Sequence, residues 1–144
     1  AHEAGVPAIL GPRGIDVPTA SFIRWTGSNP ERIQGVAAGY QQMGHKLIGF
    51  NTDAPVLPQE ELSVQSAMGV RYGLDTSNLE HLRGLTIVPA LVSGISDRVG
   101  SIEAGKDADL LIVNGDPADP RTAIDQVWIQ GRLAYDAIGD LRLW

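Results

Sequence analysis

The chain has 144 residues, of which 43% are hydrophobic, so it is long and apolar enough to bury the core of one ordinary globular domain. Its 17 acidic residues outnumber its 11 basic residues, and no cluster of lysines or arginines is present, which argues against nucleic-acid binding. No apolar run approaches the roughly 18 residues that span a bilayer, and no secretory signal pattern opens the chain, so we expect a soluble protein without a membrane segment.

The first half of the chain is predicted to contain two strands joined by a helix. Ala8–Leu10 is a short apolar run that predicts a buried strand. Residues 33–43 carry apolar side chains at helical spacing, and Gly44 predicts the end of that helix. Residues 47–50 are almost continuously apolar, as in a parallel strand that is buried on both faces. Strand, helix and strand in this order predict a β-α-β unit.

Two further helices and a β-rich segment are predicted after residue 50. Helical spacing of apolar residues indicates the first helix, at Val64, Ala67, Met68 and Tyr72. The same spacing at Leu79, Leu82 and Leu85 indicates a second helix that begins near Asn78, and Gly73 separates the two. From residue 99 onward, apolar segments between turns predict strands at 100–102, Leu110–Val113, 127–129 and 133–135, with a hairpin turn at 130–131. We therefore expect an α/β portion followed by a β portion.

Asp53 is the strongest candidate for a catalytic residue. It follows the apolar run at residues 47–50, at the C-terminal end of a predicted parallel strand, where active sites assemble in α/β proteins. The chain has no cysteine, so any metal must be bound by His, Asp or Glu. A carboxylate here could bind a divalent cation and accept a proton from its bound water. An aspartate in this place could also cap the next helix or accept hydrogen bonds from loop amides.

Three residues in or beside the long polar loop after the first strand are candidates for substrate binding: Arg13, Arg24 and Trp25. The loop follows the C-terminal end of a predicted strand, which is the end that substrate approaches. The planar guanidinium group of arginine suits a substrate carboxylate, because it can donate two parallel hydrogen bonds. A solvated loop arginine without a functional role is the alternative. The sequence leaves both interpretations open.

The three histidines are not expected to bind a metal. His2 and His45 precede predicted strands and therefore lie at the end opposite to Asp53, where residues serve stability. His81 falls within a predicted helix, where we expect a partly exposed structural histidine. Residues 105–109 contain a glycine and a lysine but lack the spacing of a phosphate-binding loop, and we predict a tight turn there.

Several motifs occur in a fixed order along the chain: NTDAP at residues 51–55, QEEL at 59–62, RVGSIEAGKDADL at 98–110 and NGDP at 114–117. Together they resemble the amidohydrolase superfamily, in its imidazolonepropionase-like and prolidase-like branch. The resemblance extends to Tyr135 and so covers nearly the whole chain.

This resemblance implies a (β/α)8 TIM barrel whose strand ends hold one or two divalent metals. Residues 1–98 would form the last part of the barrel, and residues 99–144 would form strands of a small β-sandwich. The family's aspartate at the end of the eighth strand binds metal and shuttles a proton between the attacking water and the leaving group, and that position matches Asp53. The expected metal is zinc.

The activity implied by the resemblance is hydrolysis of a carbon–nitrogen bond in an amide, cyclic amide or dipeptide-like substrate. The family's other ligands are a His-x-His pair, a carboxylated lysine or glutamate, and two further histidines, all on earlier strands. A complete barrel takes roughly 200 residues or more. We therefore expect a C-terminal fragment, inactive alone, whose partner is the upstream N-terminal polypeptide of the same enzyme.

Two alternatives to this activity stay open. The first is a deaminase or phosphoesterase on the same scaffold, because a fold does not determine a reaction. The second is a non-catalytic binding or structural subunit that lost its metal. The sequence also leaves open a homo-oligomer, and a location in the cytoplasm or, with an upstream signal peptide, in the periplasm or outside the cell.

Overall fold

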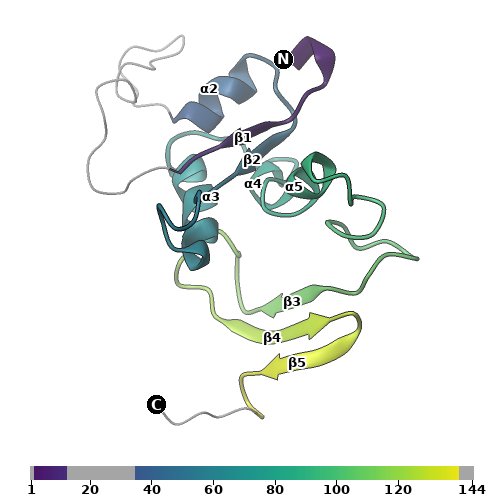
Figure 1. Ribbon diagram of the computed structural model, residues 1–144. Helices are drawn as coiled ribbons and strands as arrows, with labels where there is room; N and C mark the ends of the chain where they lie inside the picture. Colours follow the sequence, from purple (N-terminus) through teal and green to yellow (C-terminus); the bar gives the residue numbers. More distant parts are fainter. Residues whose placement is uncertain (1, 13–34, 140–144) are drawn as a thin grey trace.

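A parallel strand pair covered by helices, followed by an antiparallel sheet, makes up the part of the chain that the computed structural model describes, residues 2–12 and 35–139 (Figure 1). The elements are η1 (His2–Ala4), β1 (Ala8–Leu10), α2 (Val36–Gln42), β2 (Ile48–Phe50), η2 (Gln59–Glu61), α3 (Leu62–Arg71), α4 (Glu80–Arg83), α5 (Ile87–Val92), β3 (Leu110–Val113), β4 (Ile124–Ile129) and β5 (Arg132–Asp136). The predicted α/β class is confirmed. Within these residues no helix is long and apolar enough to cross a membrane.

The predicted β-α-β unit is confirmed by the pairing of β1 with β2. The two strands are parallel, and Ala8 lies opposite Ile48 while Leu10 lies opposite Phe50. All three residues of β2 are buried, as its continuous apolar run predicts. Gly44, with φ of 92°, follows α2 in the left-handed conformation that glycine adopts readily. The carboxyl ends of both strands therefore lie at one edge of the molecule.

The core lies where α2, α3 and β2 meet. Its buried apolar residues are Ala37, Ile48, Phe50 and Leu74. Gly84 lies so close to β2 that a Cβ there would be 2.6 Å from the Ile48 carbonyl oxygen. The Gly84 carbonyl also accepts a hydrogen bond from the Phe50 N–H, at 3.2 Å. The segment after α4 thus packs directly on the backbone of β2.

The predicted apolar face of α3 is not the face that is most buried. The helix itself is confirmed, but Val64, Ala67 and Met68 are half-buried, and the fully buried residues are Gln65, Ser66 and Gly69. Small or hydrogen-bonding residues occupy the buried face because α3 packs closely there against β2 and α4. Gly69 lies beside the Phe50 ring, and the Ser66 hydroxyl donates to the His81 carbonyl at 2.8 Å.

The helix predicted to begin near Asn78 is confirmed as the short α4, and a second short helix that was not predicted, α5, follows it. Pro89 lacks an N–H and would clash with the carbonyl of residue 85 in a continuous helix, so it fits only the first turn of a new one. Leu79 was expected on the apolar face, yet it is 57% exposed and has φ of 60°.

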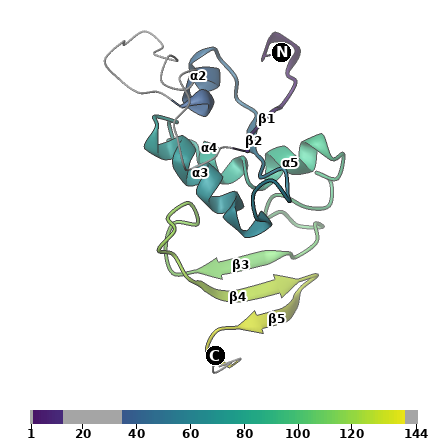
Figure 2. The same ribbon diagram turned by 60° about the vertical axis from the view of Figure 1, so that its left-hand side comes forward.

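The antiparallel sheet confirms three of the four strands predicted after residue 99. Its order is β3-β4-β5, and β3 is the strand nearest to the helices in both views (Figures 1 and 2). Gln130 and Gly131 form the predicted hairpin turn, with φ of 50° and 71°, as a two-residue turn of type I′ requires. The strand predicted at 100–102 was wrong. Gly100 has φ of 94° and a Cβ there would lie 2.8 Å from that of Ala90, so this segment turns against α5.

Candidate functional site

The loop that follows β2 begins beside the end of β1. The Asn51 N–H donates a hydrogen bond to the Leu10 carbonyl at 3.0 Å, which continues the parallel ladder beyond Phe50. Gly11 follows Leu10, and a Cβ at Gly11 would lie 2.1 Å from the Asn51 carbonyl oxygen. Its φ of 132° is also one that other residues rarely adopt. The two strand ends can therefore approach this closely only with glycine at position 11.

Asp53 lies in this loop, three residues past β2, and is exposed. Its φ of 49° places it in the left-handed region, which costs a non-glycine residue about 1–3 kcal/mol. Three hydrogen bonds offset this cost. The Asp53 N–H donates to Asn51 Oδ1 at 2.8 Å, the Asp53 carbonyl accepts from the Val56 N–H at 2.9 Å, and the Leu57 N–H donates to the Thr52 carbonyl at 3.2 Å.

Among the residues that the structure describes, the Asp53 carboxylate performs neither of the structural roles that the sequence left open. The residues that precede η2 and α3 as caps are Pro58 and Glu61, so Asp53 caps neither helix. Within residues 2–12 and 35–139, no amide or side chain donates a hydrogen bond to its carboxylate oxygens. An exposed carboxylate in this position is suited to bind a ligand.

A divalent metal needs more ligands than this loop supplies. No group of three or more His, Asp and Glu side chains lies close enough to hold a metal ion among the residues that the structure describes. Structural and catalytic zinc sites ordinarily use three or four protein ligands. Asp53 can fill one position of such a site, and the described residues alone do not form the rest.

One of the predictions about the three histidines was wrong. His45 precedes β2, is 7% exposed, and its ring centroid lies 5.0 Å from that of Tyr40. His81 was expected to be partly exposed, but it is 5% exposed in α4, because α3 packs against it through Ser66. His2 belongs to η1. Neither His45 nor His81 joins a metal cluster within the described ranges.

The three predicted substrate-binding residues, Arg13, Arg24 and Trp25, lie outside the described residues.

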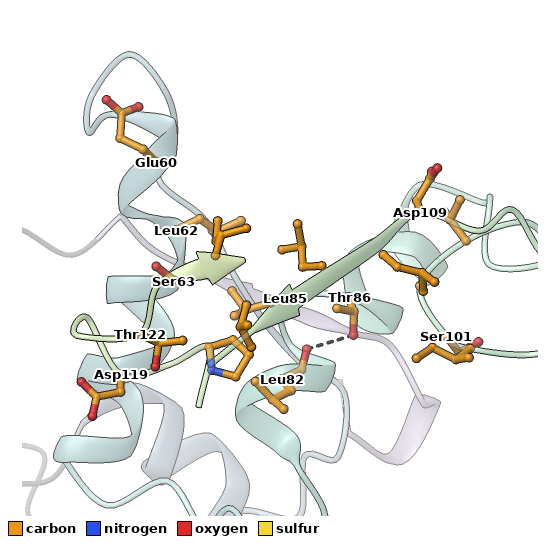
Figure 3. Close-up of a pocket in the computed structure, with 18 of the residues that line it drawn as sticks. Glu60, Leu62, Ser63, Leu82, Leu85, Thr86, Ser101, Asp109, Asp119 and Thr122 are labelled. Atoms are coloured by element: carbon orange, nitrogen blue, oxygen red, sulfur yellow. Dashed lines mark hydrogen bonds between the residues drawn. The ribbon is translucent and has the colours of Figure 1, made fainter. Parts of the chain in front are cut away.

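A groove of about 900 Å³ separates the helices from β3, and the sequence patterns did not predict it. Figure 3 shows its apolar middle, which includes Leu62, Leu82 and Leu85, with the carboxylates of Glu60 and Asp109 at its margins. Its lining contains neither a histidine nor Asp53. The signal available in the sequence was the apolar side chains of α3 and β3, because apolar surface on two neighbouring elements often marks a groove.

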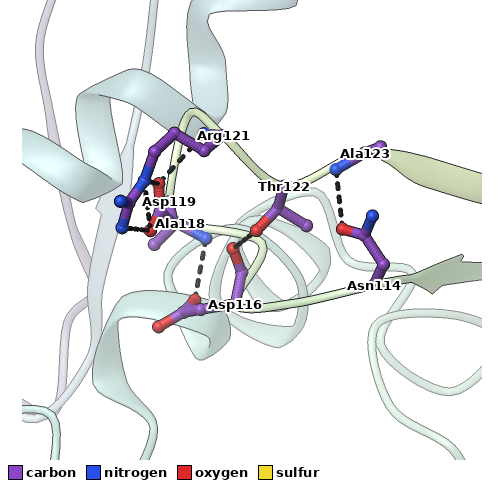
Figure 4. Close-up of polar contacts among 7 residues, drawn as sticks. All are labelled: Asn114, Asp116, Ala118, Asp119, Arg121, Thr122 and Ala123. Atoms are coloured by element: carbon purple, nitrogen blue, oxygen red, sulfur yellow. Dashed lines mark hydrogen bonds and ion pairs between the residues drawn. The ribbon is translucent and has the colours of Figure 1, made fainter.

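The connection between β3 and β4 is held by its own polar side chains (Figure 4). Asn114 Oδ1 accepts from the Ala123 N–H at 2.9 Å, and the Thr122 hydroxyl donates to the Asp116 carbonyl at 2.6 Å. Arg121 donates to both oxygens of Asp119, at 3.0 Å from Nε and 2.6 Å from Nη2. These hydrogen bonds from Arg121 lower the pKa of the Asp119 carboxyl from 3.8 to about 2.

Two curated proteins are similar to parts of this chain. Amidohydrolase tasK of Hapsidospora irregularis is 36% identical over 87 residues, which is 60% of this chain and 9% of that protein. The N-substituted formamide deformylase of Arthrobacter pascens is 41% identical over 66 residues, which is 42% of this chain and 12% of that protein. The chain thus spans about a tenth of the length of these relatives.

Solved structures resemble the fold over a larger share of the chain. The crystal structure of an amidohydrolase from Thermotoga maritima matches 94% of this chain and 33% of its own, with a TM-score of 0.69 and 31% identity. A prolidase complexed with N-methylphosphonate-L-proline matches 69% of this chain and 25% of its own, with a TM-score of 0.52 and 28% identity. The model of the amidohydrolase family itself matches residues 16–134, which include β2, the Asp53 loop and most of the antiparallel sheet, whereas β1 precedes the matched range. The chain therefore belongs to the amidohydrolase family.

Proposed function

We propose that this chain is the C-terminal part of a metal-dependent hydrolase that acts on a carbon–nitrogen bond, with Asp53 as a ligand to the metal. The observation that carries the proposal is the exposed Asp53 carboxylate, which follows the carboxyl end of β2 and has no partner among the described residues. Active sites of barrel enzymes assemble at this end of the strands. The family membership and the two curated relatives, one called an amidohydrolase and one a deformylase, support a hydrolase.

The proposed substrate is an amide, a cyclic amide or a dipeptide-like molecule. A bound divalent cation, with zinc as the proposed ion, would supply a water of lowered pKa and polarise the substrate carbonyl. Asp53 would contribute one carboxylate ligand and hold a proton on its second oxygen between attack and departure of the leaving nitrogen. Arg13, Arg24 and Trp25 are proposed to contact the substrate.

The remaining ligands are proposed to come from the upstream N-terminal polypeptide of the same enzyme. In this proposal residues 1–98 complete the barrel and residues 99–144 supply strands of a small β-sandwich. The share of the Thermotoga chain that is matched, 33%, supports a larger complete protein. The 144-residue chain by itself would then be inactive, because Asp53 alone cannot hold a catalytic metal.

The test compares the complete protein with its Asp53→Asn variant. Asparagine keeps the shape and tolerates the left-handed backbone, but it removes the charged ligand. We expect the variant to fold, to lose metal measured by elemental analysis, and to lose at least about 100-fold in kcat on a panel of amides and dipeptides. Asp97→Asn, which changes an exposed aspartate outside the loop, should leave both unchanged.

Three outcomes would contradict the proposal. Near-wild-type turnover by Asp53→Asn would remove the assigned role of Asp53. Turnover of nucleobases or phosphoesters in place of amides would identify one of the alternative reactions. A complete protein without metal or turnover would favour a binding subunit.

A further inference from the structure

We propose that Asn51 is a positioning residue, whose side-chain carbonyl holds the Asp53 backbone in the conformation that directs the Asp53 carboxylate. This inference rests on the proposed role of Asp53. It concerns how that carboxylate is placed, and it assigns Asn51 no contact with substrate or metal.

The backbone of Asn51 is held in place by contacts with the end of β1. Its N–H donates to the Leu10 carbonyl at 3.0 Å, and its carbonyl lies against Gly11, where any Cβ would be 2.1 Å away. β1 and β2 are paired in register up to this residue. Asn51 therefore starts from a position that the parallel strand pair determines.

The side chain of Asn51 links the Asp53 backbone to this fixed strand end. Its Oδ1 accepts the Asp53 N–H at 2.8 Å, and Asp53 has φ of 49°. The value of φ decides the direction in which Cβ leaves the backbone, and with it where the carboxylate can reach. Without the Oδ1 acceptor, the Asp53 N–H would lose the partner that favours the left-handed conformation, and the residue could relax to negative φ.

The pairing of this bond with a left-handed donor distinguishes Asn51 from other turns in the chain. Four further side chains in the described ranges accept an N–H from the residue two positions on: Asp75, Asp116, Asp119 and Asp136. None of the four donors, Ser77, Ala118, Arg121 and Ile138, has a positive φ. Asn51 is also the neutral member of the group, so it supplies the acceptor without placing a second negative charge beside Asp53.

The experiment uses the complete protein and three substitutions. Asn51→Leu keeps the size of the side chain and removes the acceptor, whereas Asn51→Ser keeps a weaker acceptor. Asn114→Leu is the matched control, because Asn114 Oδ1 also accepts a backbone N–H, at 2.9 Å, in the distant β3–β4 connection. The measurements are kcat and KM on the best amide substrate, zinc affinity by competition with a chelator, and melting temperature.

We expect Asn51→Leu to lower kcat and zinc affinity by about 10- to 100-fold, as loss of a supporting hydrogen bond to a ligand does, with KM changed by less than about 3-fold. Asn51→Ser should recover most of the loss. Asn114→Leu should lower the melting temperature by a similar amount and leave kcat and zinc affinity unchanged.

Wild-type kcat and zinc affinity in Asn51→Leu would overturn the inference, as would an equal loss in Asn114→Leu. If Asn51→Leu does not fold, Asn51→Ala decides, because it also removes the acceptor and adds no bulk to the loop. Wild-type kcat and zinc affinity in Asn51→Ala would overturn the inference. Asp53→Asn separates the two proposals, because a fully active Asp53→Asn contradicts the proposed function itself.

Discussion

His81 Nε2 in α4 lies 3.6 Å from Asp116 Oδ1 in the β3–β4 connection, and this contact joins the helices to the antiparallel sheet. The His81 side chain is 6% exposed, whereas the Asp116 side chain is 57% exposed. His81 Nδ1 is buried and has no hydrogen-bond partner in the described part of the chain. The contact is therefore a buried imidazole held by packing, with a solvated carboxylate beside it.

This geometry predicts that His81 contributes to stability through burial more than through the carboxylate. His81→Ala should lower the free energy of unfolding by about 1–3 kcal/mol, because it leaves a cavity beneath α3. Asp116→Ala should cost about 1 kcal/mol, mainly through the lost hydrogen bond from the Ala118 N–H. The double variant, measured by denaturant unfolding, should show a coupling of about 0.2–1 kcal/mol, because one partner is solvated. A coupling above 2 kcal/mol would indicate a strong ion pair instead.

Gly11→Ala should destabilise the ends of β1 and β2 more than the backbone strain of an alanine at positive φ does by itself. The new Cβ would lie 2.1 Å from the Asn51 carbonyl oxygen, so the strand ends must separate. We expect the free energy of unfolding to fall by about 3 kcal/mol or more, because the steric clash adds to the backbone strain. Gly5→Ala is the control, since Gly5 also has a positive φ, 65°, but has open space around it. A smaller melting-temperature loss in Gly11→Ala than in Gly5→Ala would contradict the close approach.

The hairpin between β4 and β5 should become more stable with a better turn residue. Gln130 has φ of 50° and precedes Gly131 with φ of 71°, and asparagine tolerates this first position better than glutamine. Gln130→Asn should raise the free energy of unfolding by about 0.5 kcal/mol, and Gly131→Val should lower it by more than about 1 kcal/mol. Amide hydrogen exchange within β4 and β5 measures both. Faster exchange in Gln130→Asn than in the wild type would contradict the assigned left-handed turn at Gln130 and Gly131.

Asp119 should titrate at unusually low pH because of Arg121. Its carboxyl pKa is lowered from 3.8 to about 2, first by the hydrogen bonds from the Arg121 side chain. A lowered pKa stabilises the folded chain above about pH 4, and that contribution is lost as pH falls towards 2. Carboxyl NMR titration should therefore show the Asp119 pKa rising towards 3.8 in Arg121→Gln. Arg132→Gln, which removes an arginine from β5, should leave it low.

Local patterns in the sequence were enough for the elements whose formation depends on neighbouring residues. Ala8–Leu10, Leu110–Val113 and the turn at Gln130 and Gly131 were predicted with their observed bounds, because apolar runs and turn residues act over a few positions. The place of Asp53 after a buried parallel strand was also predictable. Its role as a metal ligand stays a prediction.

Other features depend on contacts between segments far apart in the chain, and only the tertiary structure decided them. The buried face of α3 contains Gln65 and Ser66 because α4 lies close enough to accept the Ser66 hydrogen bond, which no periodicity in α3 reveals. His81 is buried for the same reason. The left-handed Asp53 depends on Asn51, whose backbone is placed by pairing with Leu10, 41 positions earlier. Such contacts depend on the complete fold, because the burial of a residue and its close neighbours are set by segments that lie far away in the sequence.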